Sequence, residues 1–457
     1  MNIRFIMNVL GRLRQVRRQA EWSRERLERH QADALRRLRA HAYAHSSFYQ
    51  RFHAGLFDRP LEELPVLTKA AMMDAFDDLM TDPAIRLADV RVHLAAESAG
   101  APYLGRYRVN ATSGSSGNPG IFLFDEDEWL TVMASFARAQ EWAGAGVKLY
   151  RRRRMATVAS LSPWHMSAQV GASAQTLWTP SIRIAASEPL AQIVERLNGW
   201  QPHVLITYAS MARILAEEQL AGRLAIRPET VFASSEVLTD ETRRRVKLAW
   251  GSEPFNQYAS TETAEIAAEC RECRRMHLFE DLVLVEVVDE QHRPVPPGEY
   301  GARLLVTTLF SRTQPLIRYA LNDSVRLGPS VAQACPCGRP FGVLEGVQGR
   351  VEDLLRLPGL RGEPVTIQPL VFNRVMDILP ISGWQVAQEA DGSLTVLVSG
   401  TRAGFDSAAL VQELGRALAE QGAQPPSIRV QQVAAIAKSA SGKAPLIKAW
   451  RDAPVVR

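Results

Sequence analysis

The stretch Thr112-Ser-Gly-Ser-Ser-Gly-Asn-Pro-Gly120 says most about the fold of this chain. Its nine residues include three glycines, four hydroxyl side chains and no carboxylate. Glycine lets backbone N–H groups approach an anion closely, and the hydroxyls add hydrogen-bond donors. Apolar residues lie on both sides, with Tyr107 and Val109 before the stretch and Ile121-Phe-Leu-Phe124 after it. This pattern predicts a loop between two strands, with a composition suited to the phosphates of ATP.

The common nucleotide-binding patterns are absent from this loop. No lysine follows the glycines, as the pattern G-x-x-x-x-G-K-[ST] requires, and the spacing G-x-G-x-x-G is also missing. Ser/Gly runs are common linkers as well. A nucleotide-binding loop and a flexible turn therefore both remain open from this stretch alone.

Three later segments favour the nucleotide-binding loop. They are Tyr258-Ala-Ser-Thr-Glu262, Arg318-Tyr-Ala-Leu-Asn-Asp323 and Ala437-Lys-Ser-Ala-Ser-Gly-Lys443. In this order and at these separations, the four motifs resemble those of the adenylate-forming (acyl/aryl-CoA synthetase) superfamily. The resemblance is greatest to its phenylacetate–CoA ligase branch, which also contains the coenzyme F390 synthetase-like proteins. It extends from about Leu35 to Lys443, most of the chain.

The resemblance implies an α/β fold of two parts. A large N-terminal adenylate-forming domain has parallel sheets flanked by helices, and a small mobile α+β domain follows it. We expect a basic helical segment over residues 1–45, the large nucleotide- and substrate-binding domain over 46–351 and the small domain over 352–457. A chain of 457 residues is also too long for one ordinary core.

Alternating apolar strands and amphipathic helices support a parallel sheet covered by helices. Strands are predicted at Met155–Ala159, Val204–Thr207, Thr230–Ala233 and Pro254–Gln257, with helices at Leu190–Asn198, Ser210–Ala221 and Asp240–Trp250. Antiparallel strands are predicted at Leu282–Val288 and Ala302–Thr308. In the small domain we expect a hairpin of Trp384–Val386 with Leu394–Val398, a helix at Ser407–Gln421 and a strand at Ile428–Val433.

Composition excludes several classes of protein. Apolar and charged contents of 46% and 23% are typical of globular proteins. No apolar run is long enough to span a bilayer, and dense charge near the start disfavours a secretory signal. Four cysteines are too few for a disulfide scaffold, so a reducing, cytoplasmic location is expected.

Positive charge is concentrated at the N-terminus. Residues 1–39 contain eleven arginines against four acidic residues, an excess larger than the net charge of +5, so the remainder is slightly acidic. A solvated arginine face on a packing helix is one interpretation. An acidic carrier-protein partner, an anionic membrane surface or nucleic acid are the others. No interleaved aromatic residues support nucleic acid, and we expect no nucleic-acid partner.

The resemblance assigns residues to the binding of ATP. The loop from Thr112 would hold the β- and γ-phosphates through Thr112, Ser113, Gly114, Ser115, Ser116 and Gly117. The segment Ser234–Leu238, with Ser235 and Glu236, would lie beside the adenine. Tyr258 would stack on the adenine, Asp323 would accept hydrogen bonds from the ribose hydroxyls, and Arg350 would reach the ribose or the α-phosphate.

Further residues are implied for catalysis. Thr261 would contact the α-phosphate, and Glu262 would ligate Mg²⁺, which prefers hard oxygen ligands. Lys443 would enter the site during adenylation and contact the substrate carboxylate and α-phosphate. His165 stands where the superfamily often has an aromatic residue or histidine beside the substrate and thiol channel; a core or surface histidine is the alternative.

This chain departs from the superfamily pattern at three places. Gly120 stands where a lysine usually ends the phosphate loop, although the phenylacetate branch also lacks that lysine. Glu352 replaces a common hinge aspartate, and Ala437 replaces a common proline before the catalytic lysine. The first departure leaves the charge of pyrophosphate to Mg²⁺ and to other cations.

All four cysteines occur in two close pairs, Cys270-x-x-Cys273 and Cys335-Pro-Cys337. Thiolates at such spacing can bind one tetrahedral ion, so a structural Zn²⁺ is predicted, with His277 as a substitute ligand. Free buried thiols are the alternative. A redox pair is disfavoured because no thioredoxin-like context surrounds the cysteines.

These features predict an ATP-dependent, AMP-forming ligase that activates a small carboxylic acid and transfers it to a thiol. The thiol is CoA or the phosphopantetheine of an acyl carrier protein, and the assembly could be a homodimer. An adenylyltransferase that makes a phosphoester or amide is the first alternative. A non-catalytic scaffold that binds a partner through the basic helix is the second.

Overall fold

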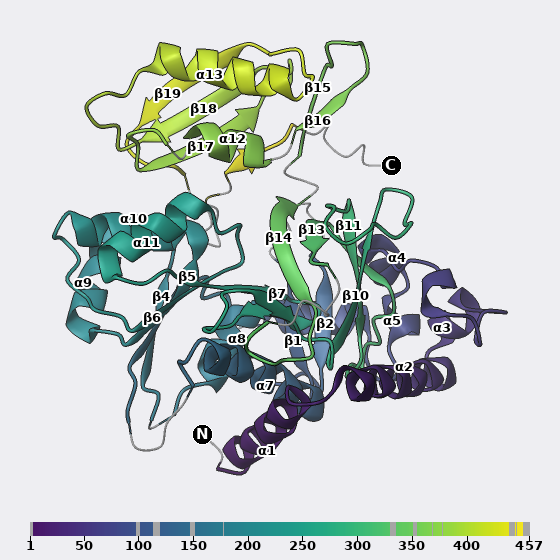
Figure 1. Ribbon diagram of the computed structural model, residues 1–457. Coiled ribbons are helices and arrows are strands. Elements are labelled where there is room, and N and C mark those ends of the chain that lie inside the picture. The colour runs from purple at the N-terminus through teal and green to yellow at the C-terminus, as the bar shows by residue number, and fades with distance from the viewer. Residues whose placement is uncertain are drawn as a thin grey trace.

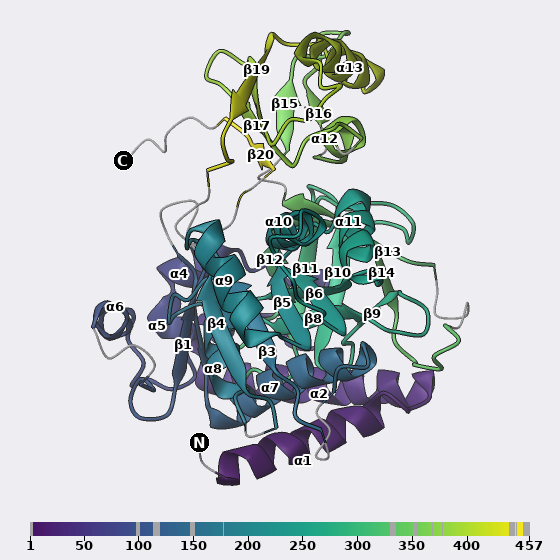
Figure 2. The same ribbon diagram turned by 90° about the vertical axis from the view of Figure 1, so that its left-hand side faces the viewer.

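The fold is described by a computed structural model of the whole chain. It describes residues 3–96, 101–112, 119–146, 151–176, 178–329, 335–350, 354–367, 369–376, 378–437, 444 and 446–450. A large body holds the N-terminal and central parts of the chain, and a smaller unit, green to yellow in Figure 1, lies above it. Figure 2 shows the same two-part arrangement from the side. The predicted α/β fold class is thereby confirmed.

A nine-stranded sheet forms the centre of the large body. Its strand order is β13-β14-β9-β8-β7-β6-β5-β3-β4. The strands are β3 (Met155–Ala159), β4 (Ser181–Ala185), β5 (Val204–Tyr208), β6 (Thr230–Ser234), β7 (Phe255–Ser260), β8 (Ala264–Glu269), β9 (Met276–Leu278), β13 (Asp323–Leu327) and β14 (Val343–Arg350). Strands β4, β3, β5, β6 and β7 are parallel, and the sheet becomes antiparallel from β7 to β8.

Helices cover this sheet through two separate cores. The helices are α7 (Glu126–Trp142), α8 (Met166–Ser173), α9 (Leu190–Trp200), α10 (Ala209–Leu220) and α11 (Asp240–Trp250). Helices α9, α10 and α11 share one apolar core with β3 to β6. Helix α7 shares another core with β8 and with the N-terminal helices. Burial on both faces explains why the parallel strands have continuous apolar runs.

Two smaller sheets complete the large body. The hairpin of β1 (Arg108–Ala111) and β2 (Ile121–Phe124) flanks the glycine-rich stretch, so the predicted strand–loop–strand arrangement is confirmed. The strands β10 (Val283–Val288), β11 (Arg303–Thr308) and β12 (Tyr319–Leu321) form an antiparallel sheet. Helices and one 3-10 turn precede them: α3 (Ser47–Phe52), Leu61–Glu63, α4 (Lys69–Asp74), α5 (Phe76–Leu79) and α6 (Leu87–Ala95).

The smaller unit has a core of its own, built on a four-stranded sheet of order β19-β18-β17-β20. Its elements are β15 (Leu355–Leu357), β16 (Val365–Ile367), α12 (Pro369–Met376), β17 (Gly383–Gln388), β18 (Leu394–Ser399), α13 (Ser407–Glu420), β19 (Ile428–Val433) and β20 (Ile447–Lys448). The predicted hairpin, helix and strand of this part are confirmed. The domain boundaries at 45/46 and 351/352 stay predictions.

The predicted helix over residues 1–45 is wrong in one respect, because the structure has two helices there. Helix α1 (Ile3–Gln19) ends before a turn, and α2 (Arg24–His45) begins anew. The side chain of Ser23 caps the second helix by accepting a hydrogen bond from the backbone N–H of Arg26 at 3.3 Å. Both helices lie along the base of the large body (Figure 2).

Some arginines of these helices serve in packing. Arg12 forms an ion pair with Asp127, and the Nε of Arg17 donates to Glu141 at 2.7 Å, both on α7. Arg24 pairs with Glu280 at 2.7 Å. These contacts support the interpretation of a packing helix with a solvated arginine face. Among the described residues, no helix is long and apolar enough to cross a membrane.

A buried ion pair joins three segments of the large body. Arg138 of α7 and Asp281 are both completely buried and make two contacts, at 2.7 and 2.9 Å. Arg138 also donates to the carbonyl of Val16 at 3.3 Å, and its guanidinium lies over the ring of Phe279 at 4.0 Å. One side chain thus links α1, α7 and the segment before β10.

Removing one member of this pair should be costly. We predict that Arg138→Met lowers the free energy of unfolding by about 3–5 kcal/mol, because it leaves Asp281 as an uncompensated buried charge. Urea denaturation followed by tryptophan fluorescence measures this. The matched control, Arg36→Met, breaks an exposed pair with Asp33 and should cost at most about 1 kcal/mol. Equal losses in the two variants would contradict the prediction.

Candidate active site

The hairpin β1–β2 holds the ends of the glycine-rich loop together. The backbone N–H of Thr112 donates to the carbonyl of Gly120 at 2.9 Å, and the N–H of Gly120 donates to the Thr112 hydroxyl at 2.9 Å. The predicted phosphate-binding residues Ser113, Gly114, Ser115, Ser116 and Gly117 lie outside the described residues. These two hydrogen bonds fix the positions of Thr112 and Gly120, at the two ends of the loop.

The carboxyl end of β6 carries the segment predicted to lie beside adenine. Ser235 directly follows this strand and has a backbone φ of 64°, a left-handed conformation for which glycine is the usual residue. A carboxylate oxygen of Glu236 accepts a hydrogen bond from the N–H of Ser210 at 2.8 Å, which connects the segment to α10. Strand β6 and this hydrogen bond to α10 therefore both hold the turn in place.

The turn between β7 and β8 carries Thr261 and Glu262. It is stabilised by Ser260, whose hydroxyl accepts from the N–H of Thr263 at 3.2 Å and lies 3.0 Å from the Thr263 hydroxyl. Glu262 is only 9% exposed. Burial raises the pKa of Glu262, an effect only partly offset by hydrogen bonds and by the charge of Arg350. A nearby cation would therefore favour the charged form of this carboxyl group.

Three predicted nucleotide-binding residues, one each on β7, β13 and β14, lie close together. The Tyr258 hydroxyl donates to a carboxylate oxygen of Asp323 at 2.7 Å. Asp323 begins β13 and is the direct cross-strand partner of Arg350 at the end of β14. Burial, and then the neighbouring Asp323 charge, raise the pKa of Tyr258 well above its usual range, so the phenol stays protonated and donates.

His165 occupies the N-cap position of α8, next to the first strand of the hairpin. The carbonyl of its neighbour Trp164 accepts a hydrogen bond from the N–H of Ala111 at 2.8 Å. This contact places His165 close to the base of the glycine-rich loop.

One cavity of about 2830 Å³ collects these side chains. Nine predicted residues line it: Thr112, His165, Ser235, Glu236, Tyr258, Thr261, Glu262, Asp323 and Arg350. They come from elements far apart in the sequence, and residues of the smaller unit, including Trp384 and Arg402, also line it. Lys443, Lys438 and Glu352 lie outside the described residues. The roles of all these residues stay predictions.

Arg318, the first residue of the third motif, has a different location. It is 4% exposed, pairs with Glu286 at 2.9 Å and donates to the carbonyl of Glu62 at 2.8 Å. The N–H of Leu67 in turn donates to the carbonyl of Arg318 at 3.0 Å. The arginine therefore fixes the segment before α4.

That segment brings in a residue to which the sequence analysis gave no role. Lys69 begins α4 and lines the cavity. A side chain built on Gly120 would meet the Cε of Lys69 at 3.5 Å, so the lysine lies against the base of the glycine-rich loop. The missing lysine within the loop was the available signal, since phosphates still need a cation.

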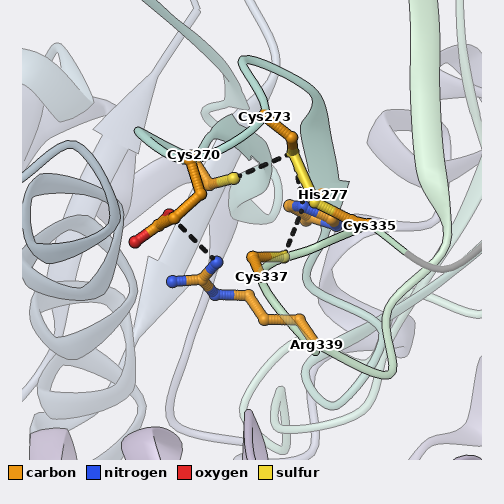
Figure 3. Close-up of a disulfide and its surroundings, with 7 residues drawn as sticks. Cys270, Cys273, His277, Cys335, Cys337 and Arg339 are labelled. Atoms are coloured by element: carbon orange, nitrogen blue, oxygen red, sulfur yellow. Dashed lines mark hydrogen bonds and ion pairs between the residues drawn. A yellow bond between two sulfur atoms is a disulfide. The ribbon is translucent and has the colours of Figure 1, made fainter.

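The cysteines and His277 gather at the end of β8 and on β9. One ligand atom from each of Cys270, Cys273, His277, Cys335 and Cys337 lies within 4.8 Å of all the others. Figure 3 shows the five side chains directed toward one centre, with Arg339 beside them. Cys273 and Cys335 are joined as a disulfide, whereas the prediction had all four as thiolates. The two cysteine pairs are close enough to form this disulfide. After its reduction, they are also close enough to share one metal ion.

The arrangement suits chemistry on a nucleotide. The carboxyl ends of parallel strands, Thr112 at the base of the glycine-rich loop and two cations, Lys69 and Arg350, border the same cavity. Ligands of open α/β sheets bind at this edge. No Ser/His/Asp triad is needed, because positioning and charge stabilisation dominate phosphoryl and adenylyl transfer.

Comparison with known proteins finds similar sequences and a similar fold. No family model matches the chain. The chain is 27% identical to a phenylacetate–coenzyme A ligase of Thermus thermophilus over 81% of this chain and 80% of that protein, and 25% identical to the Escherichia coli enzyme of that name over 75% and 76%.

A solved structure of 2-hydroxyisobutyryl-CoA ligase, in the postadenylation state with an acyl-AMP, superposes with a TM-score of 0.75. The superposition covers 95% of this chain and 91% of that one at 20% identity. The chain is therefore a relative of the phenylacetate–coenzyme A ligases and has the fold of the adenylate-forming CoA ligases.

Proposed function

We propose that this protein is an ATP-dependent, AMP-forming ligase that activates a small carboxylic acid as its adenylate and transfers the acyl group to CoA. The main support for this proposal is that residues from separate motifs line one cavity. Sequence similarity to enzymes with this activity, over most of the chain, supports it.

Several polar groups of the cavity have a task in adenylation. The carboxylate of the acid attacks the α-phosphate of ATP, and pyrophosphate leaves. Asp323 accepts hydrogen bonds from the ribose, and Tyr258, held by that carboxylate, presents its ring to the adenine. Thr261 donates to the α-phosphate. Such donors act most strongly where charge develops in the transition state.

Positive charge for the leaving pyrophosphate comes from outside the glycine-rich loop. Lys69, against the base of that loop, supplies the cation that the loop itself lacks. Glu262 suits Mg²⁺, because its buried carboxyl group offers hard oxygen atoms and a cation would offset its desolvation. When bound there, Mg²⁺ would neutralise phosphate charge.

The smaller unit completes the site through Lys443, which we propose to neutralise the α-phosphate during adenylation only. Contacts that join the two parts involve side chains at the rim. Arg402 pairs with Glu217 of α10, and Arg213 donates to the carbonyl of Ile381 at 3.4 Å. These few polar contacts are compatible with a small domain that rotates between half-reactions.

The acceptor of the acyl group and the type of product each have an alternative. An acyl carrier protein could replace CoA as acceptor, and an adenylyltransferase or amide-forming enzyme remains the alternative on the same fold. A fumarate–(S)-2,3-diaminopropanoate ligase of Enterobacter agglomerans is 24% identical over 48% of this chain, and its name pairs a carboxylic acid with an amino acid. Thiol-dependent release of AMP distinguishes the ligase from these enzymes.

The activity is tested by its two half-reactions. We predict that wild-type protein exchanges labelled pyrophosphate into ATP when the cognate acid is present, in a screen over a library of carboxylic acids. Lys443→Ala should lower this exchange about 10²–10³-fold, yet should convert presynthesised acyl-adenylate and CoA to thioester at close to the wild-type rate. Lys448→Ala, an exposed lysine on β20, is the matched control.

Three outcomes would count against the proposal. Absence of exchange with every acid contradicts an adenylate-forming activity. Equal loss in both half-reactions would show that Lys443 has a structural role. Normal exchange in Lys443→Ala would point to Lys438 instead.

Asp323 provides a test of the nucleotide site. We predict that Asp323→Ala raises the KM for ATP tenfold to a hundredfold, since each lost charge-assisted hydrogen bond is worth roughly 1.5–3 kcal/mol. Initial rates of pyrophosphate exchange at varied ATP measure this. Asp323→Asn keeps the shape beside Tyr258, and Glu345→Ala, which lines the cavity on β14, is the control. An unchanged KM in both Asp323 variants would remove this residue from the site.

We also propose that the reduced cysteines hold a structural Zn²⁺. Ligands at about 2.3 Å around a tetrahedral zinc lie about 3.8 Å apart, a spacing that the observed cluster allows. Five candidate side chains are present for four positions, so His277 can replace one cysteine. The cluster joins β8 and β9 to the segment that leads into β14.

We predict about one zinc per chain in protein purified with a thiol reductant and without chelator, as expected of a closed four-ligand site. Elemental analysis measures the metal. Cys335→Ser should lower the melting temperature. It should leave the ratio of rates among different acids nearly unchanged, because the cysteines do not line the described cavity. Reduced protein without metal would contradict the zinc site.

A further inference from the structure

Strand β8 places a second buried carboxyl group beside the turn that carries Glu262. Glu265 is 1% exposed and lines the same cavity. Its partner across the sheet is Ala259 of β7, a small residue that also lines the cavity. Within the described ranges, neither carboxyl oxygen of Glu265 has a hydrogen-bond partner. A buried carboxyl group without a partner costs free energy, so it calls for an explanation.

The nearby charged residue does not compensate for the burial of the Glu265 carboxyl group. Arg138 is the cation that acts on it, but the guanidinium of Arg138 already makes two contacts with Asp281. Burial raises the pKa of Glu265 well above its usual range, and Arg138 offsets this only in part. Among the residues that the structure describes, the carboxyl group of Glu265 therefore has no strong counter-charge.

Five other acidic residues of the cavity differ from Glu265 in this respect. Their partners lie within the protein: Glu236 with Ser210, Glu269 with Arg243, Glu188 with Arg196, Glu241 with Arg244 and Asp323 with Tyr258. Their places in the cavity wall are explained by contacts within the protein. Glu265 is left with its oxygens available to a ligand.

We propose that Glu265 recognises a protonated amine on the carboxylic acid that this enzyme activates, so that the substrate class is amino acids with the two groups separated by an apolar body. The inference rests on the proposed function. The acid's carboxylate must lie near Thr261 for adenylation, and Glu265 is four residues further along the same hairpin. Phe136 and Met166, which also line the cavity, offer apolar surface to the body of the substrate.

A buried carboxylate makes a charge-assisted hydrogen bond to an ammonium group that an apolar isostere cannot replace. In matched pairs of acids, such as 6-aminohexanoate with heptanoate and 4-(aminomethyl)phenylacetate with 4-ethylphenylacetate, wild-type protein should favour the amine in at least one pair. The expected preference in kcat/KM for pyrophosphate exchange is tenfold or more, about the value of one such bond.

Substitution of the carboxyl group then tests its role. Glu265→Leu should reverse the preference within that pair, and Glu265→Gln, which keeps the size of the side chain, should abolish most of it. Glu345→Gln is the matched control, since Glu345 lines the cavity from β14 and pairs with Arg326. It should leave the ratio unchanged. Because the ratio compares two acids on one preparation, loss of folded protein does not alter it.

A binding measurement keeps this inference separate from the proposed activity. n-Butylammonium should raise the melting temperature of wild-type protein more than n-butanol does, and Glu265→Gln should remove the difference. Ammonium binding without any acid-dependent exchange would support Glu265 while contradicting the ligase. Exchange with apolar acids only, or an amine preference that survives both Glu265 substitutions, would overturn the role of Glu265.

Discussion

Strand β7 is hydrogen-bonded in parallel to β6 on one side and antiparallel to β8 on the other. At this one strand the nine-stranded sheet changes from the helix-covered parallel half to the antiparallel half. The change requires a tight turn at the carboxyl end of β7, and Thr261 and Glu262 form that turn. The cavity therefore lies where both halves of the sheet meet, and residues from either half can reach it.

The neighbours of β7 extend this arrangement. Ser235 follows β6, while Tyr258 of β7 contacts Asp323 at the start of β13. Asp323 and Arg350 are at the same level because β13 and β14 are paired there. Backbone hydrogen bonds thus set the relative positions of side chains that are separated by more than a hundred residues. Rigid elements hold such groups more precisely than loops do.

Buried charged residues of the large body differ in whether an opposite charge of the protein neutralises them. Arg138 and Asp281 neutralise each other, and Arg138 connects helix α1 to helix α7. Glu262 and Glu265 are buried at the cavity, and burial raises the pKa of both. Desolvation of an unpaired carboxyl group disfavours its charged form, which a cationic ligand restores. The first kind supports the fold and the second kind is suited to ligands.

The sequence determined the fold class because apolar runs and amphipathic stretches depend on local spacing. Strands β3 and β19 and helix α11 have the predicted bounds. The break at Ser23 was missed, since a cap is one side chain within a continuous helical pattern. The motifs also named nine of the residues that line the cavity, because hydroxyl, phenol, carboxyl and guanidinium groups can be chosen by their chemistry.

Tertiary structure alone decided which of these residues are neighbours. Lys69 and Glu265 carry no local signal, because a lysine after Thr68 or a glutamate in a strand is ordinary until the fold buries it or places it against a loop. Arg318 lies within a predicted motif, yet the fold pairs it with Glu286, and it does not line the cavity. Likewise, the two cysteine pairs are 62 residues apart and become one cluster only through the pairing of β9 with β14. Long-range strand pairing is a property of the whole chain, and no short segment encodes it.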